Sequence, residues 1–495
     1  MWESSIEHQI SPIPPAGGTK KLASTIARQI EADIVRRGWP VGESLGSEQA
    51  LQQRYGVSRS VLREAVRLVE HHRVARMRRG PGGGLLISEP DAGPATRAVV
   101  IYLEYLGTTL ADLLNARLVL EPLAASLAAE RIDEAGIERL RAVLREEEHW
   151  RPGLPAPRDE FHIALAEQSK NPVLQLFIDV LMRLTTRYAL RSRTDSASEA
   201  IEALDYMHHD HCEIVAAVTA GDSARAKTLS ERHVEAVNAW LQEHHPGAGR
   251  AARPGHRREQ ADGEVPRGKL AEVLAATIGD EIGSGDWQIG SVFGTETALL
   301  QRYRVSRAVL REAVRLLEYH SVAQMRRGPG GGLVVAKPHA QASIDTIALY
   351  LQYRKPSRED LRCVRDAIEI DNVAKVVKRR AEPEVAAFLY THRSALDGTA
   401  HAADDARQAT SEELRFHHGL AQLAGNALLD LFLRIIVELF RRHWTSTGQE
   451  PPARSDVDAV EHAHSRILEA ITAGDDSLAR YRIRRHLDAA ASWWL

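Results

Sequence analysis

Residues 53–70 read QRYGVSRSVLREAVRLVE and residues 301–318 read QRYRVSRAVLREAVRLLE, so one stretch of this 495-residue chain occurs twice. The two copies lie 248 positions apart (301 − 53), and the same offset relates RMRRGPGGGL at Arg76 to QMRRGPGGGL at Gln324. Solenoid repeats recur every ~20–50 residues, which is much shorter than this offset. The sequence therefore indicates the duplication of a whole unit that makes up about half of the chain.

Each unit divides again into a small and a large part. Residues 244–268 read HHPGAGRAARPGHRREQADGEVPRG, which is rich in Gly, Pro and charge and lacks apolar periodicity, as expected of a linker. A second break lies near Pro90, with its counterpart at Pro338. At about 150 residues per domain, the length fits three or four domains. The predicted domains are 18–90 and 95–243, then a linker over 244–265, then 266–338 and 341–495.

The composition is that of an ordinary globular protein, with 44% hydrophobic and 26% charged residues. No segment approaches the ~18 consecutive apolar residues that a membrane helix needs, and residues 1–20 lack the apolar core of a signal peptide. Cys212 and Cys363 are far apart and show no CxxC spacing, which excludes a disulfide framework. We therefore expect a cytoplasmic protein.

The distribution of charge separates the small parts from the large ones. The whole chain has a formal net charge of −3, but residues 18–90 hold 13 Lys and Arg against 7 Asp and Glu, a balance of +6. Residues 266–338 hold 10 against 7, a balance of +3. Two basic modules that alternate with acidic ones indicate a nucleic-acid partner for the basic pair.

The first small module shows the spacing of a helix-turn-helix. Apolar residues at helical intervals predict a first helix over 22–37, and Ser47 is placed to cap a short second helix through Arg54. Gly56 supplies the backbone freedom for a tight turn, and a third helix follows from Ser58 to about position 71. Two short helices joined by such a turn are typical of DNA-reading modules.

The third helix has one apolar and one basic face. The apolar stripe consists of Leu62, Ala65, Val66 and Val69. Arg59, Arg63 and Arg67 recur every four residues and share the opposite face, where a guanidinium can bond a guanine edge or a phosphate. An arginine stripe alone is usually a solvated surface. We expect Arg59, Ser60 and Arg63, nearest the helix N-terminus, to reach deepest into a major groove.

A glycine-rich hairpin is predicted after this helix. Short strand-like runs at 74–77 and 85–87 flank RRGPGGG, whose bare backbone can approach a sugar-phosphate chain while Arg78 and Arg79 supply charge. A glycine loop can also cradle a nucleotide phosphate, but this one lacks the GxxxxGK[ST] pattern. The sequence thus predicts a wing, and its recurrence beside a second arginine stripe favours DNA binding.

These residues resemble the N-terminal winged helix of GntR regulators. The resemblance rests on LGSEQALQQRYGVSRSVLREAVRLVE followed by RRGPGGGLLI, and it covers residues 22–88 and 270–336. It implies that the arginines of the third helix contact bases and phosphates. It also implies that an acidic residue on the second helix and a glycine in the wing match positions of the family's DNA-binding domain. Arg304 departs from the first copy, which has Gly56 there. The predicted DNA-binding residues are Glu48, Arg59, Ser60, Arg63, Arg78, Arg79 and Gly82, and in the second half Glu296, Arg307, Arg311, Arg326, Arg327 and Gly330.

The large parts are predicted to be antiparallel helical bundles, because amphipathic helices recur there with few strand signals. The predicted fold class is therefore mainly α, with two winged helix-turn-helix domains that alternate with two all-α bundles. Histidines recur at matched places in both bundles, with separations of 49 and 22 residues in the first and 47 and 22 in the second. Three imidazoles from three helices can hold a divalent cation such as zinc. The matched triads are His162, His211 and His233, and His417, His464 and His486.

Other histidines do not follow this pattern, and we expect them at the surface: His71, His72, His208, His209, His418 and His462.

The large parts also resemble the FCD ligand-binding domain of the FadR-like branch of GntR regulators. The resemblance implies six or seven helices and a metal held by three His and an Asp that precedes the first His by four residues. The second half has Glu413 there, whereas the first half has Arg158, with Asp159 one position later. The second half is therefore the better candidate for an intact metal site.

Arg117 and Arg365 match the Arg-x3-Glu helix of that family. An arginine that points into a metal-bearing cavity suits a carboxylate effector, which it can grip with two hydrogen bonds. The alternative is an i, i+4 pair with Glu121 or Glu369 that only stabilises the helix. Asn171 and Asn426 match a family asparagine at a helix end, where we expect a structural role.

The sequence thus predicts a DNA-binding transcriptional regulator, a repressor released from its operator by a small organic acid. Fusion of both units lets one chain supply two readers to an inverted repeat, and a homodimer of the fused chain stays open as an alternative. Two other functions compete. A metal-dependent hydrolase would use the histidine clusters, but no HExxH motif is present. An architectural protein would bind DNA without sequence preference and with steep salt dependence.

Overall fold

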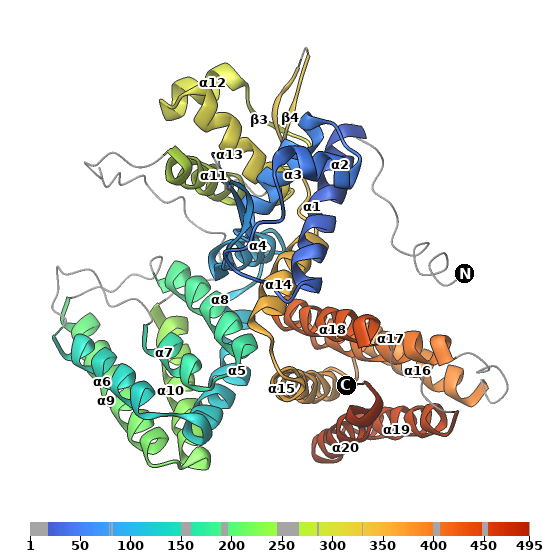
Figure 1. The fold of residues 1–495 in the computed structure, drawn as a ribbon. Helices are drawn as coiled ribbons and strands as arrows, with labels where there is room; N and C mark the ends of the chain where they lie inside the picture. The colour runs from blue at the N-terminus through green and yellow to red at the C-terminus, as the bar shows by residue number, and fades with distance from the viewer. Residues whose placement is uncertain are drawn as a thin grey trace. The chain divides into compact units, whose positions relative to one another are not determined.

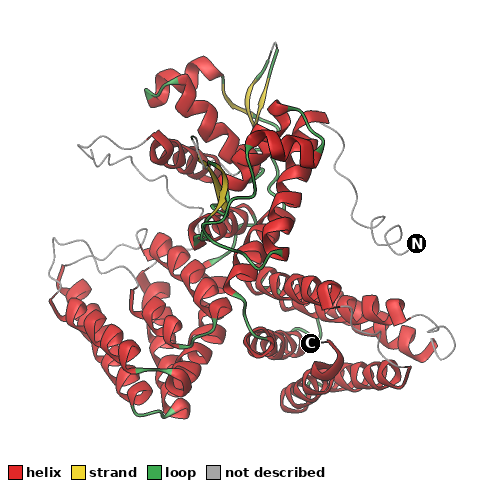
Figure 2. Cartoon of the chain, viewed as in Figure 1, coloured by secondary structure: helices red, strands yellow, loops and turns green. Residues whose placement is uncertain are grey.

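The computed structural model describes the chain in two compact units, residues 1–95 and 96–495. Helices dominate both, and in the described parts short strands form only one two-stranded and one three-stranded sheet (Figure 2). The predicted mainly α fold class is therefore confirmed. The described residues are 18–78, 80, 83–149, 160–189, 197–244, 267–284, 287–328, 330–398, 406–447 and 454–494.

The first winged module has the predicted order of elements (Figure 1). Ser47 and Ser58 cap the second and third helices by accepting hydrogen bonds from the amides of Ala50 and Val61, and Gly56 ends the second helix with φ of 62°. The predicted apolar stripe of the third helix is buried. The elements are α1 (Gly18–Arg36), α2 (Glu48–Tyr55), α3 (Arg59–His71), β1 (Ala75–Arg78) and β2 (Gly84–Ile87), so the first helix begins four residues before the predicted start.

The two strands of the first wing pair antiparallel, with Ala75 opposite Ile87 and Arg78 opposite Gly84. Gly84 has φ of 148°, and a Cβ built on it would lie 2.6 Å from the carbonyl oxygen of Gly46. Glycine is therefore required where the wing begins to close onto the body of the module.

The second winged module repeats this plan with one additional strand. Its sheet has the order β3-β5-β4, whereas the first module has only an isolated bridge between Ser44 and Leu86 at the place of β3. Arg304 ends α12 with φ of 51°, the left-handed conformation that Gly56 adopts in the first copy. The elements are α11 (Arg267–Ser284), β3 (Val292–Gly294), α12 (Glu296–Tyr303), α13 (Arg307–Tyr319), β4 (Ala323–Arg326) and β5 (Gly332–Val335).

The first helical domain is built around the long helix α5, which packs against α7, α8, α9 and α10. Thr109 and Asp112 start α5 with a reciprocal capping box, in which each side chain bonds the other residue's backbone amide. The helices are α4 (Ala92–Tyr105), α5 (Leu110–Arg131), α6 (Glu134–His149), α7 (Glu160–Gln168), α8 (Pro172–Ala189), α9 (Ala197–Thr219) and α10 (Ser223–His244).

The second helical domain has the same order of helices, and Ser357 and Asp360 form the equivalent capping box at the start of α15. Its central helix α15 packs against α17, α18, α19 and α20. The helices are α14 (Ala340–Arg354), α15 (Arg358–Lys378), α16 (Pro383–Gly398), α17 (Ala406–Ala424), α18 (Ala427–Thr447), α19 (Arg454–Ala473) and α20 (Asp476–Trp494). No helix in the described ranges is long and apolar enough to cross a membrane. The predicted linker falls almost entirely outside the described residues, because α10 ends at His244.

The two helical domains pack on each other through equivalent surfaces. Phe177 of α8 and Phe432 of α18 stack with ring centroids 3.9 Å apart and planes 6° from parallel. The amide of Asn171 donates to the carbonyl oxygen of Asp360 at 2.9 Å, and the amide of Asn426 does the same to Asp112 at 2.9 Å. These reciprocal contacts relate the domains as two subunits of a symmetric dimer are related, although both belong to one chain.

Each of these asparagines also caps a helix. The side-chain oxygen of Asn171 accepts from the amide of Val173 at 2.9 Å, and that of Asn426 accepts from Leu428 at 3.1 Å. The structural role expected of these asparagines thus has two parts. The side-chain oxygen caps a helix, and the side-chain nitrogen bonds the other helical domain.

We expect Gly56→Ala to lower the free energy of unfolding of the first winged module by about 1 kcal/mol, because alanine is strained at positive φ. No atom lies within 4 Å of a Cβ built there, so the backbone conformation alone causes the loss. Arg304→Ala is the matched control, since it exchanges one strained side chain for another. Urea unfolding of both variants measures the difference, and an equal loss in both would contradict this account.

Candidate functional site

The first recognition helix carries its arginines as predicted. Arg59 and Arg63 lie on the exposed face of α3, and their Nε atoms donate to the same carboxylate oxygen of Glu48 at 3.0 and 2.9 Å. The hydrogen bond from Arg59 and the charges of both arginines hold the pKa of Glu48 below its ordinary value, so this carboxylate stays ionised. Glu48 therefore orients two guanidinium groups at the N-terminal end of the helix, where DNA-reading helices contact base edges.

The second recognition helix presents the same arginines in a different setting. Within the described part of the chain, no ion pair joins Arg307 or Arg311 of α13 to Glu296, which stands where Glu48 does. The hydroxyl of Ser60, which lies 3.1 Å from that of Ser58, is replaced by the methyl group of Ala308. The two recognition helices therefore present related but different hydrogen-bond donors to DNA.

The wings place further basic residues at their strand ends. Arg78 ends β1 and Arg326 ends β4, with Arg327 directly after it. Gly330 lies in the second wing tip with φ of 72°. Arg79 and Gly82 of the first wing lie outside the described residues.

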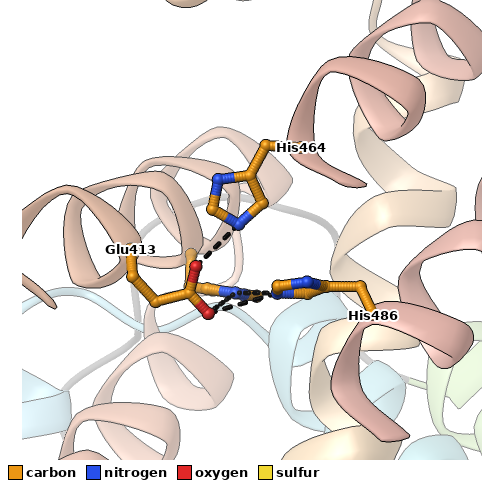
Figure 3. A group of neighbouring side chains, drawn as sticks. Glu413, His464 and His486 are labelled. Atoms are coloured by element: carbon orange, nitrogen blue, oxygen red, sulfur yellow. Dashed lines mark hydrogen bonds and ion pairs between the residues drawn. The ribbon is translucent and has the colours of Figure 1, made fainter. Parts of the chain in front are cut away.

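The predicted ligands of the second helical domain converge in its interior (Figure 3). Glu413 and His417 come from α17, His464 from α19 and His486 from α20. One Glu413 oxygen lies 3.2 Å from Nε2 of both His417 and His486, and the other lies 2.7 Å from Nε2 of His464. Three imidazole nitrogens and one carboxylate, all within 4.8 Å of one another, are a donor set that suits a tetrahedral cation site.

The charges around this cluster set the protonation of its members. Burial lowers the pKa of His464 to about 4, although Glu413 opposes the shift. Burial also lowers the pKa of His417, but Glu369 and Glu413 outweigh it and raise the value to about 10. Glu369 contacts Nδ1 of His417, so a carboxylate orients the ring from behind as metal-site histidines usually require.

The histidines of the first helical domain also converge. His162 of α7, His211 of α9 and His233 of α10 place one ring nitrogen each within 4.8 Å of the others. The Nε2 atoms of His211 and His233 are 3.2 Å apart. Phe161 stacks on His211 at 3.7 Å, as Phe416 stacks on His464 at 3.8 Å. Asp159, the predicted acidic ligand of this site, lies outside the described residues.

A carboxylate contacts the Nδ1 atom of every histidine in the first cluster. The distances are 2.8 Å from Glu121 to His162, 3.0 Å from Glu147 to His211 and 3.2 Å from Asp210 to His233. The sequence predictions missed Glu147 and Asp210. Asp210 could have been noticed as the residue before His211, but Glu147 comes from α6 and is 64 residues away from its partner.

In the second domain, no carboxylate among the described residues contacts Nδ1 of His464 or His486. Ala463 precedes His464, where Asp210 precedes His211 in the first domain.

The two predicted effector arginines differ in their partners. Nε of Arg117 bonds Glu121 at 2.5 Å, while its buried Nη1 has no hydrogen-bond partner among the described residues. Arg365 instead gives Nε and Nη2 to Asp366 at 3.1 and 3.0 Å. The i, i+4 pair is therefore formed in the first domain, and in the second the distance to Glu369 is 3.9 Å.

Two histidines expected at the surface are partly or wholly buried. His72 contacts Glu31 inside the first winged module, and its side chain is 8% exposed. Nδ1 of His208 lies 3.2 Å from a carboxylate oxygen of Glu147, and this side chain is 28% exposed. In both cases a carboxylate from another helix covers an imidazole that the sequence pattern leaves on the polar side.

Comparisons with known proteins agree with both domain types. A family described as "Bacterial regulatory proteins, gntR family" matches residues 22–84 and 270–333, and the FCD domain matches residues 112–236 and 360–489. The Uxu operon regulator of Haemophilus influenzae is 27% identical over 252 residues, which cover 48% of this chain and 87% of that protein. LutR of Bacillus subtilis is 30% identical over 206 residues, 40% of this chain and 92% of that protein.

A third relative, the putative L-lactate dehydrogenase operon regulatory protein of Escherichia coli, is 27% identical over 258 residues, 49% of this chain and 96% of that protein. A solved GntR structure from Streptococcus agalactiae covers 44% of this chain and 99% of its own length at 24% identity, with a TM-score of 0.32. Each relative thus corresponds in length to one half of the chain. These relatives are regulators and not enzymes, and the chain belongs to the gntR family of bacterial regulatory proteins, as a transcriptional regulator in which the DNA-binding domain and the FCD domain each occur twice.

Proposed function

We propose that the chain is a repressor that binds a two-part operator as a single polypeptide and leaves it when a small carboxylate binds in the metal-holding helical domains. The observation that carries this proposal is the reciprocal pairing of the helical domains, which gives one chain the architecture of a dimer. Two complete winged modules then belong to one polypeptide. Their covalent connection raises the effective concentration of the second reader once the first has bound.

Further polar side chains contribute to the contact between the two helical domains. Besides the two asparagine amides, Arg131 of α5 pairs with Asp360 of α15 at 3.0 Å, and Lys375 of α15 contacts Asn115 of α5. Polar groups in a partly buried interface fix its register, because a shifted pairing would leave them without partners. The two halves of one chain therefore pair in one arrangement.

The differences between the two readers predict the form of the operator. Arg59 and Arg307, with Arg63 and Arg311, give both readers the bidentate donors that suit guanine. Ser60 adds a hydroxyl that the second reader lacks, so the two half-sites should be related by approximate rather than perfect inversion. Arg304 adds a positive charge at the turn of the second reader, which favours an additional phosphate contact.

The residues of both clusters fit a divalent cation of the zinc type. Such a cation binds imidazole nitrogens and carboxylate oxygens, and the second cluster offers three of the former and one of the latter, with the proton of His417 displaced when the cation binds. When bound, it would act as a Lewis acid toward the oxygen of a carboxylate effector. Arg117 and Arg365 lie next to the carboxylates that orient His162 and His417, where a guanidinium can grip the same effector.

The name of one relative suggests the first effector to test. That protein is named for an L-lactate dehydrogenase operon, and L-lactate has the carboxylate that an arginine and a cation would hold together. L-Lactate is therefore the first small acid to titrate against the operator complex.

Selection of bound duplexes from a random DNA library should enrich an imperfect inverted repeat that binds one chain per duplex. Arg63→Ala should weaken binding to the selected site by about 1–3 kcal/mol and relax the preference at one position of one half-site. Arg232→Ala is the control, since this arginine is exposed on α10 and pairs with Glu213. Electrophoretic mobility shifts with quantified protein measure both quantities.

Two chains per site would contradict the single-chain arrangement and leave a homodimer. Binding without an enriched sequence, with a steep dependence on salt, would contradict operator reading and indicate an architectural protein.

His464→Ala should lower the metal content of the purified chain by one equivalent, because it removes a buried ligand of the second cluster. His418→Ala should leave the content unchanged, since this neighbouring histidine is 43% exposed and contacts Asp430 instead. Elemental analysis by mass spectrometry after dialysis measures the metal content of both variants. A wild-type chain that retains no metal after loading with Zn²⁺ would refute the proposed cation sites.

A further inference from the structure

We infer that Glu70 and Glu318 couple each wing to its recognition helix, so that the two DNA-contacting elements of a winged module meet the duplex at one fixed spacing. Each glutamate is a positioning residue for DNA binding. Its side chain bonds the first strand of the wing, and the DNA contacts fall to the neighbouring arginines. The inference rests on the operator binding proposed above.

The same contact is present in both winged modules. Oε1 of Glu70, in the last turn of α3, accepts a hydrogen bond from the backbone amide of Met77 in β1 at 2.8 Å. Oε1 of Glu318, in the last turn of α13, accepts one from the amide of Met325 in β4 at 3.1 Å. In contrast, the ion pairs of Glu48 with the arginines of α3 have no counterpart among the described residues of the second module.

The amide of Met77 needs an acceptor outside the sheet. Met77 lies opposite Leu85 of β2, whose own amide donates to the carbonyl oxygen of Gly46 at 3.0 Å, on the other edge of β2. Opposite residues in an antiparallel pair exchange either both hydrogen bonds or neither, so the amide of Met77 also points out of the sheet. A carboxylate oxygen of the recognition helix therefore takes the place that a further strand would fill.

Each glutamate is bonded to both ends of the connection between helix and wing. The backbone carbonyl oxygen of Glu70 accepts from the amide of Arg73 at 3.0 Å, and Arg73 has φ of 58°. In the second module, the carbonyl oxygen of Glu318 accepts from the amide of Ser321 at 3.2 Å, and Ser321 has φ of 55°. The left-handed residue reverses the chain, and the side-chain bond then holds the returning strand beside the last helical turn.

The bonded amide lies next to a basic residue of the wing. Arg78 follows Met77 and is exposed at the end of β1. Arg63 lies seven residues before Glu70, which is two helical turns and about 10 Å along the axis of α3. One helix and one hydrogen bond therefore set the distance between an arginine placed for the major groove and an arginine placed for the flanking backbone. The same spacing recurs in the second module with Arg311, Glu318, Met325 and Arg326.

This coupling affects DNA binding in a defined way. A wing that is held to the helix adds its phosphate contacts at little further cost in conformational freedom, because its conformation is set before DNA binds. A released wing has to be ordered during binding. Loss of the coupling therefore lowers the affinity and the number of phosphate contacts, while the base preference of the recognition helix stays the same.

Hydroxyl-radical footprinting of the full chain on the duplex selected from the random library tests the coupling. Glu70→Ala should weaken binding about three- to ten-fold, the range for the loss of one hydrogen bond, and remove protection only at the flank of one half-site. Glu318→Ala should do the same at the other half-site. Glu70→Gln should restore the protection, because its amide oxygen accepts the same hydrogen bond. Glu64→Ala is the charge control and should not weaken binding, since it removes a carboxylate of the same helix that pairs with Arg67.

Arg78→Ala completes a double-mutant cycle with Glu70→Ala. If Glu70 acts through the wing, the double variant should bind about as tightly as the weaker single variant, and the salt dependence of log K should fall by about one in all three. Additive losses would overturn the inference. Unchanged protection at the flank in Glu70→Ala would also overturn it. Loss of protection over the whole half-site would show that Glu70 only supports the fold of the module.

Hydrogen exchange of the free chain separates this inference from operator binding. Glu70→Ala should speed the exchange of residues 75–78 while the amides of α3 stay protected, and Glu70→Gln should exchange like the wild type. If the wild-type chain enriches no duplex, operator binding fails, and the exchange still decides whether Glu70 holds the wing. Equal exchange in the wild type and Glu70→Ala would overturn the inference even where the chain binds its duplex.

Discussion

Two buried asparagine amides join the halves of this chain, and the rest of the architecture depends on them. Asn171 and Asn426 each start a helix with the side-chain oxygen and reach a carbonyl of the other helical domain with the nitrogen. Because a buried amide is costly when unpartnered, capping and pairing are satisfied together. The chain thereby gains within one polypeptide the reciprocal interface that a homodimer forms between two copies.

Covalent duplication removes a constraint that symmetry imposes on a homodimer. Two identical subunits must read identical half-sites and carry identical ligand sites, whereas two halves of one chain can change independently. The readers have diverged at the turn, where Gly56 corresponds to the strained Arg304, and on the recognition helix, where Ser60 corresponds to Ala308. The apolar face of that helix has stayed nearly the same, since it must fill the same small core.

The histidine clusters show how the same chemistry is rearranged after duplication. Each domain keeps three buried histidines and a stacked phenylalanine, but the surrounding carboxylates differ. In the first domain carboxylates contact Nδ1 of all three rings, whereas in the second Glu369 contacts Nδ1 of His417 and Glu413 lies at Nε2. Among the described residues, the buried Nη1 of Arg117 has no hydrogen-bond partner, whereas Arg365 is paired with Asp366.

The sequence alone determined the repeat, the helix-turn-helix, the wing and the histidine triads, because these features are encoded by local spacing along a helix or turn. It also identified Glu413, which lies one helical turn before His417. Only the tertiary structure showed that Glu147 and Asp210 orient the first cluster, that Asn171 and Asn426 bond across the halves, and that Arg117 and Arg365 have different partners. The reason is physical, since contacts between helices depend on how the bundle packs, and side-chain spacing within one helix carries no information about its neighbours.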